Sequence, residues 1–93
     1  MTVDRAVTLL PPGMTNSVFG QDVMKWGTGD AAARARMGTL TRAELEGAGV
    51  TKDIAKSWRD FYQQVKASNP SNPSAQGRME LMQRALELLG GGQ

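Results

Sequence analysis

Apolar residues recur at helical spacing along most of the chain, in runs that glycine and proline interrupt. The strongest run begins after Thr51, a good N-cap, and ends near residue 67 or 68. Its apolar positions are Ile54, Ala55, Trp58, Phe61, Tyr62 and Val65. A second run follows Asn72 and Pro73, which suit the cap and first position of a helix. Its apolar stripe comprises Ala75, Met79, Met82, Leu86 and Leu89. The pattern predicts two main helices that pack as an antiparallel pair.

Three shorter helices are expected before this pair, because a cap residue and a glycine stop bracket each of them. They span residues 18–26 between Ser17 and Gly27, residues 31–37 between Asp30 and Gly38, and residues 42–48 between Thr41 and Gly49. The third also has a capping box, since Glu44 stands three residues after Thr41. Strand-like alternation of comparable quality is missing from the sequence. The predicted fold class is therefore all-α, a compact bundle of about five short helices.

The first sixteen residues are expected to form an extended N-terminal arm, because Pro11 and Pro12 lack the backbone donors of a helix. Two roles are open for this arm: Val7, Leu9 and Leu10 pack on the core, or the arm is a mobile docking segment. Residues 17–90 are predicted as one helical domain and residues 91–93 as a disordered tail. The core is expected to contain Trp26, Trp58, Phe61 and Leu86.

Histidine and cysteine are both absent from the 93 residues, which removes whole classes of chemistry. A Ser-His-Asp triad, a catalytic thiol, an imidazole base, a disulfide and a His- or Cys-ligated metal are excluded. The carboxylates show no spacing that presents two acids from one short motif, so most are expected to serve as caps or helix-face partners. Gly27-Thr28-Gly29 lacks the lysine and the strand of a phosphate loop and is expected to be a turn. No catalytic residue, metal or cofactor is predicted.

The charge balance is only mildly basic, with eleven Lys and Arg against nine Asp and Glu and a net charge of +2. Residues 42–62 nevertheless have the helix-turn-helix layout of some DNA readers, with Gly49 at the turn. The second helix of this layout offers three candidate nucleic-acid-binding cations, Lys52, Lys56 and Arg59. Asp53 and Asp60 lie among them and repel phosphate. DNA binding through this helix is an alternative hypothesis.

The last predicted helix is the first candidate for a docking or self-association face. Leu81, Ala85 and Leu88 lie off its expected buried stripe and would widen its apolar surface. Met79 and Met82 have flexible side chains that can line a groove for a partner helix, although core packing is the commoner role of such methionines.

Several motifs together resemble a small helical domain of bacteria and phages, which occurs alone and at the ends of large secreted polymorphic toxins. They are Phe19-Gly20, Trp26-Gly27-x-Gly29, Arg34-x-Arg36, Leu40-Thr41, Gly49-Val50-Thr51, Trp58-x-x-Phe61-Tyr62 and NPSNPSAQGRMELM. The resemblance covers about residues 17–89 and implies a helical fold, a bacterial or viral setting and action against a bacterial host. It assigns no catalytic role. In a toxin, the polar positions of interest would be Arg34, Arg36, Asn69, Asn72 and Arg78, each of which also has a plain structural role.

The favoured hypothesis is a non-enzymatic protein-binding module of phage or bacterial origin that inhibits a host bacterial protein. Its candidate partner-binding residues are Arg34, Arg36, Arg78, Leu81 and Leu88. The alternatives are DNA binding and a small catalytic toxin that acts on nucleic acid or nucleotide through Arg and carboxylate groups. The short apolar run near the N-terminus suits neither a signal peptide nor a membrane span, so a cytoplasmic protein without a membrane partner is expected. Self-association is a further possibility.

Overall fold

The computed structural model describes residues 8–27 and 29–90 and confirms an all-α fold. Its elements are α1 (Asn16–Val18), the π-helical turn η1 (Phe19–Val23), α2 (Ala31–Met37), α3 (Arg42–Gly47), α4 (Lys52–Ser68) and α5 (Ala75–Leu88). No strand occurs in the described ranges. The predictions for Val7 and for residues 91–93 lie outside them.

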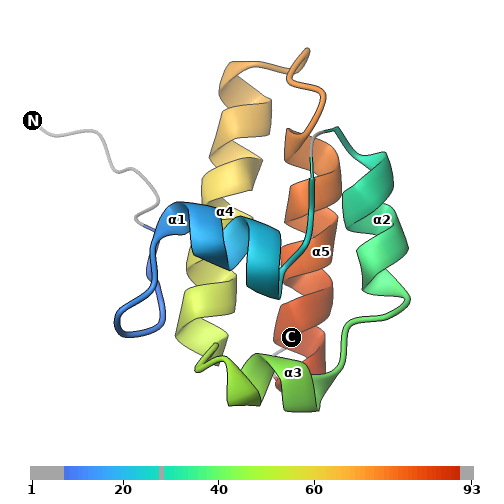
Figure 1. Cartoon of the computed structure of the whole chain (residues 1–93). Coiled ribbons are helices and arrows are strands. Elements are labelled where there is room, and N and C mark those ends of the chain that lie inside the picture. The colour runs from blue at the N-terminus through green and yellow to red at the C-terminus, as the bar shows by residue number, and fades with distance from the viewer. Residues whose placement is uncertain (1–7, 28, 91–93) are drawn as a thin grey trace, which may run out of the picture.

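Helix α5 is the centre of the bundle (Figure 1). It lies antiparallel to α4 on one flank and contacts α2 on the other. The segment formed by α1 and η1 crosses α4, and α3 contacts α5 at the end of the bundle near Leu88. The two longest helices therefore form the predicted antiparallel pair, and the shorter elements pack around it.

The starts of α3 and α4 follow the local sequence. The Thr41 hydroxyl accepts a hydrogen bond from the Glu44 backbone N–H at 3.1 Å, and a Glu44 carboxylate oxygen accepts one from the Thr41 N–H at 3.2 Å. This pair is the predicted capping box. Thr51 caps α4 in the same way, by accepting from the Ile54 N–H at 3.3 Å. Gly49 separates the helices with a φ of 82°, which glycine adopts without steric cost.

The N-terminal helix differs from its prediction. Thr15, and not Ser17, caps it, and the chain widens into a π-helical turn that ends before Met24. Lys25 then takes a left-handed φ of 54°, which turns the chain back. Trp26 consequently lies outside any helix, with its backbone N–H donating to the Gly20 carbonyl at 3.2 Å. A continuous helix was expected to put Phe19 and Trp26 on one face. The turn brings their rings into contact instead.

Two residues that were predicted as helix caps, Asp30 and Asn72, make other hydrogen bonds than expected or cap a helix that starts later. The Asp30 side chain does not cap α2. It accepts from the Gly77 N–H at 2.8 Å instead, because α5 passes close to the start of α2. Asn72 does accept from the Ser74 and Ala75 N–H groups at 2.9 and 3.1 Å, but α5 begins only at Ala75, so Pro73 precedes the helix.

All five aromatic rings form one connected cluster around Trp58. Phe19 stacks on Trp58 with ring centroids 5.1 Å apart, and Trp26 meets it at 5.4 Å. Tyr62 and Phe61 continue the cluster along α4. Trp26, Trp58 and Leu86 are buried as predicted, while Phe61 is only partly buried against the core. The aromatic stripe of α4 is therefore core and not an exposed stacking surface.

The described part of the arm packs on the bundle. Pro11 is buried, and Leu10 is partly buried against the core. The Leu9 backbone makes hydrogen bonds to Ser57 and Trp58 of α4. The packed role is confirmed for Leu10, but the prediction was wrong for the Leu9 side chain, which is exposed because only its backbone is bound to α4.

The buried face of α5 is wider than predicted. Leu81 and Ala85 are fully buried, and Leu88 is partly buried against the core. The expectation of an added apolar surface was wrong for Leu81 and Ala85, because α4 and α2 flank α5 and together cover more than one stripe, while Leu88 stays partly exposed. Met79, which was placed on the buried stripe, is only partly buried.

Candidate functional site

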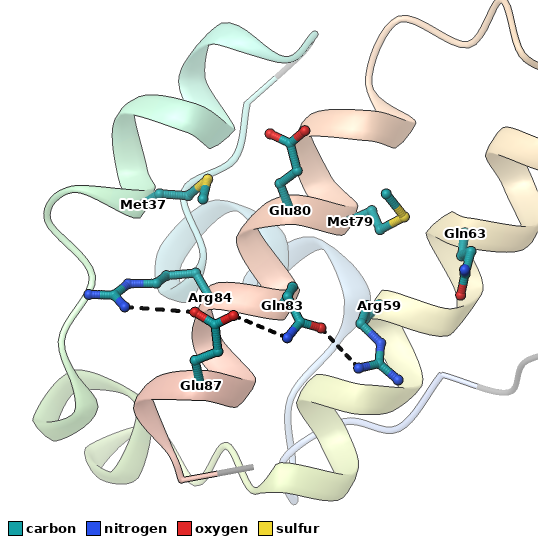
Figure 2. Close-up of a pocket in the computed structure, with 8 residues that line it drawn as sticks. All are labelled: Met37, Arg59, Gln63, Met79, Glu80, Gln83, Arg84 and Glu87. Atoms are coloured by element: carbon teal, nitrogen blue, oxygen red, sulfur yellow. Dashed lines mark hydrogen bonds and ion pairs between the residues drawn. The ribbon is translucent and has the colours of Figure 1, made fainter. Parts of the chain in front are cut away.

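A groove of about 470 Å³ runs along the outer face of α5 (Figure 2). We call it the α5 groove. Its lining residues come from α2, α4 and α5: Met37, Arg59, Gln63, Met79, Glu80, Gln83, Arg84 and Glu87. Its volume lies within the range of roughly 300–1,000 Å³ that is usual for ligand-binding clefts.

Two methionines supply the apolar part of this groove. Met37 ends α2 and Met79 lies on α5, and both are only partly buried. Figure 2 shows the two thioethers on the same side of the molecule, with Glu80 between them. Methionine side chains are flexible and polarisable and adapt to apolar groups of different shape.

The polar part of the groove is a chain of interactions. Gln83 accepts from Arg59 at 2.9 Å and donates to Glu87 at 3.2 Å. Arg84 completes the chain with an ion pair to Glu87 at 3.8 Å (Figure 2). Two arginines face two glutamates in the lining, so the formal charges of the groove cancel.

Glu80 is held as an anion at the upper end of the groove. It accepts hydrogen bonds from Gln76 and, at 3.2 Å, from Arg34 of α2. These bonds lower the pKa of the Glu80 carboxyl below its ordinary value, the Gln76 bond having the larger effect. The Arg34 guanidinium, whose pKa is raised by the same Glu80 hydrogen bond, also forms a longer ion pair with Asp30 at 3.8 Å.

The Arg36 side chain is buried and forms bonds within the fold. Its side chain is only 8% exposed and reaches from α2 to Glu44, with an Nη2 to Oε2 distance of 2.9 Å. The same nitrogen donates to the Val23 carbonyl at 3.0 Å. Arg36 therefore joins η1, α2 and the start of α3, and it is not presented to a partner.

Arg78 is also used within the chain. Its guanidinium donates to the Tyr62 hydroxyl at 3.0 Å and to the Gly27 carbonyl at 2.6 Å. It lies 5.0 Å from the centroid of the Trp26 ring, within the range of a cation–π contact. The three arginines suggested as partner-binding residues thus lie in three separate places with intramolecular partners.

The three candidate nucleic-acid-binding cations follow one another at i, i+4 and i+7 spacing along one face of α4, and acidic partners accompany them. Arg59 lines the α5 groove, whereas Lys52 lines a separate hollow beside α3. Asp60 engages two of them, with an ion pair to Arg59 at 2.9 Å and one to Lys56 at 3.5 Å. Carboxylates that neutralise these cations weaken attraction to phosphate.

Acid sensitivity follows from two carboxylates. The hydrogen bond from Arg36 lowers the pKa of the Glu44 carboxyl from its ordinary value of 4.5, as Gln76 and Arg34 do for Glu80. Because both folded-state pKa values are depressed, the stability they add is complete above about pH 4.5 and is lost as the pH falls through the folded-state values.

We therefore expect the urea midpoint of unfolding to fall between pH 6 and pH 3. In the Glu44→Gln variant this acid-induced fall should be smaller than in the wild type but not abolished, because Glu80 still titrates. An unchanged fall in the variant would contradict the assignment to Glu44.

Within residues 8–27 and 29–90, no group of three or more Asp or Glu side chains is arranged to hold a metal ion. The same residues contain no helix that is long and apolar enough to cross a membrane.

A family model described as "Domain of unknown function (DUF4951)" matches residues 1–89, which is nearly the whole chain. The chain belongs to the DUF4951 family. The matched region includes the arm as well as the helical body, so the family extends beyond residues 17–89, where the motifs indicated a resemblance. No curated protein and no solved structure matches this DUF4951 member.

Sequence reasoning missed most of the groove of this DUF4951 member. Of its lining residues, only Met79 was named as one that can line a groove, and Arg59 was assigned to nucleic acid. Three helices build the groove, and its lining residues Met37, Gln63, Gln83 and Arg84 share no local motif. The amphipathic pattern of α5 placed Met79 on the buried side, and its partial exposure depends on where α2 and α4 lie.

Proposed function

We propose that this chain is a non-enzymatic protein-binding module that receives a partner segment in the α5 groove. The observation that carries the proposal is a groove that combines two partly buried methionines with a chain of bonded polar side chains. An apolar centre with a polar rim is the usual arrangement of a protein-binding hot spot.

The proposed occupant is an uncharged segment of a partner protein that carries one apolar anchor. The anchor would lie against Met79, whose flexible side chain can adapt to its shape. The cancelled charges of the lining argue against a strongly acidic or basic occupant, because such a segment would meet a repelling group on either side. The Gln63 amide lies near Met79 in Figure 2 and can bind a peptide backbone.

The carboxylates of the groove favour binding over catalysis. A general acid needs a raised pKa to hold its proton at neutral pH, whereas hydrogen bonds lower the pKa of Glu80. Glu87 is tied to Arg84 and Gln83 on its own helix.

A bacterial protein is the first partner to test. This choice is supported by the resemblance of several motifs to a domain of phages and bacterial toxins. Under the proposal, the module acts in the bacterial cytoplasm and inhibits a host protein.

The test is affinity capture from bacterial lysate, with and without nuclease treatment, by three tagged proteins: wild type, Met79→Lys and Val18→Lys. Met79→Lys places a charge in the apolar part of the groove lining and is expected to reduce the recovered partner at least about tenfold. Val18 is an apolar residue of α1 that is 41% exposed and does not line the groove, so its lysine variant is the matched control.

A protein that both wild type and Val18→Lys recover in stoichiometric amount, and that Met79→Lys loses while remaining folded by circular dichroism, supports the proposal. Equal recovery by all three proteins would place the binding surface elsewhere. Recovery that disappears on nuclease treatment would favour nucleic acid as the partner.

A further inference from the structure

The N-terminal arm is held on α4 by two neighbouring side chains. The Ser57 hydroxyl accepts a hydrogen bond from the Leu9 N–H at 2.9 Å, and the Trp58 indole N–H donates to the Leu9 carbonyl at 2.7 Å. We call Ser57 and Trp58 the clasp, and residues 8–11 the arm segment. Ser57 also donates to the Ile54 carbonyl at 2.7 Å, which fixes the direction of its hydroxyl.

The clasp binds main chain and leaves the side chain of the bound residue free. Both hydrogen bonds go to the backbone of Leu9, whose side chain is 44% exposed. The adjoining anchor is Pro11, which is buried near Gly49. Such a site binds an extended segment with a proline two residues after the clasped position.

The core requires the clasp to be occupied. Trp58 is 4% exposed and lies at the centre of the aromatic cluster, so its indole N–H needs an acceptor that the rings around it do not offer. The Leu9 carbonyl supplies this acceptor from a segment far away in sequence.

A short hinge joins the arm segment to the bundle. Pro12 and Gly13 are exposed, and Gly13 has a φ of 76° with nothing within 4 Å of the position of an added Cβ. One hydrogen bond, from the Met14 N–H to the Pro11 carbonyl at 3.1 Å, closes the turn. Opening this turn would release the arm segment without disturbing a helix.

We propose that the clasp also binds the arm segment of a second copy of the chain, which gives an arm-exchanged dimer. The occupant follows from the structure, because a second copy carries the same residues 8–11 and repeats every contact made within one chain. Exchange of an identical element is a low-cost route to a dimer. The chain's own arm segment competes for the clasp at an effective concentration of roughly millimolar order. The fraction of exchanged dimer therefore rises with protein concentration.

The test uses the absence of cysteine from the chain. Full-length Leu9→Cys and Ser57→Cys proteins, made distinguishable by mass, are mixed at equal concentration under mild oxidation. Each protein carries one cysteine, so a disulfide between positions 9 and 57 can form only between two molecules, and a mixed covalent dimer reports exchange. The control pairs Leu9→Cys with Ser68→Cys, which introduces an exposed cysteine at the other end of the same helix.

We expect the Ser57→Cys mixture to give at least about tenfold more mixed dimer than the Ser68→Cys mixture, with a yield that rises with protein concentration. Equal yields from the two mixtures would overturn the proposal. The Leu9→Cys/Ser57→Cys double variant, which should close within one chain, verifies that the pair is in disulfide range. If this double variant forms no disulfide, either within a chain or between chains, the clasp itself is wrong and the proposal fails with it.

Discussion

Replacing Gly20 by alanine is expected to lower the free energy of unfolding by about 2 kcal/mol, although one methyl group is the only addition. A Cβ at this position would lie 2.5 Å from Trp26 Nε1 and 2.8 Å from Trp26 Cε2. The Trp26 ring cannot move away easily, because Phe19, Trp58 and Tyr62 surround it. For a domain of this size the midpoint of thermal unfolding should fall by about 8–16 °C.

Gly47→Ala is the matched control for this substitution. Gly47 is the last residue of α3, and an added Cβ would meet nothing within 4 Å. Alanine should leave stability unchanged there or raise it by up to about 1 kcal/mol, because it favours helix over the unfolded chain. Thermal unfolding followed by tryptophan fluorescence compares the two variants. Equal changes in the two melting midpoints would show that contact with Trp26 is not the reason why alanine at position 20 destabilises the fold.

The Arg36→Met variant is expected to lose about 2–3 kcal/mol of stability, although methionine retains much of the aliphatic packing. The substitution removes the donor to the Val23 carbonyl and both donors to the Glu44 carboxylate. Val23 would keep a carbonyl without its partner inside the junction of η1 and α2. Urea unfolding at pH 7 measures the loss.

Arg42→Met provides the comparison on the surface. Arg42 also has a glutamate partner, Glu46 at 2.9 Å, but its side chain is 60% exposed. Such exposed pairs contribute less than about 1 kcal/mol, so we expect this variant to lose little stability. Arg36→Lys should fall between the two, because lysine keeps the charge but cannot span three acceptors with a planar fork. A similar loss from Arg36→Met and Arg42→Met would contradict an internal role for Arg36.

Arg36 and Arg78 both have structural roles that must be separated from binding. Arg36 and Arg78 were suggested as partner-binding residues on the basis of their residue type and motif. The structure places both guanidinium groups on acceptors within the chain. A loss of partner binding in their alanine variants would therefore be explained first by a less stable fold. The Met79→Lys variant is the cleaner probe of the α5 groove.

The sequence alone determined the features that depend on a few neighbouring residues. The capping box of Thr41 and Glu44, the Thr51 cap and the long apolar period of α4 all appear where they were predicted. Each satisfies backbone groups or aligns side chains within one or two helical turns, so no distant residue is needed to specify it. The all-α fold class follows from these local signals together with the missing strand pattern.

The tertiary structure decided every feature in which distant residues compete for the same group. Asp30 is a good local cap for α2, yet its carboxylate binds the Gly77 N–H because glycine at that position allows α5 to approach closely. Leu81 is buried because two helices flank α5, which a single helical stripe cannot indicate. The α5 groove has the same origin: Met37 and Met79 become neighbours of one hollow only after α2 packs on α5, since the chain between them has no period that relates their side chains.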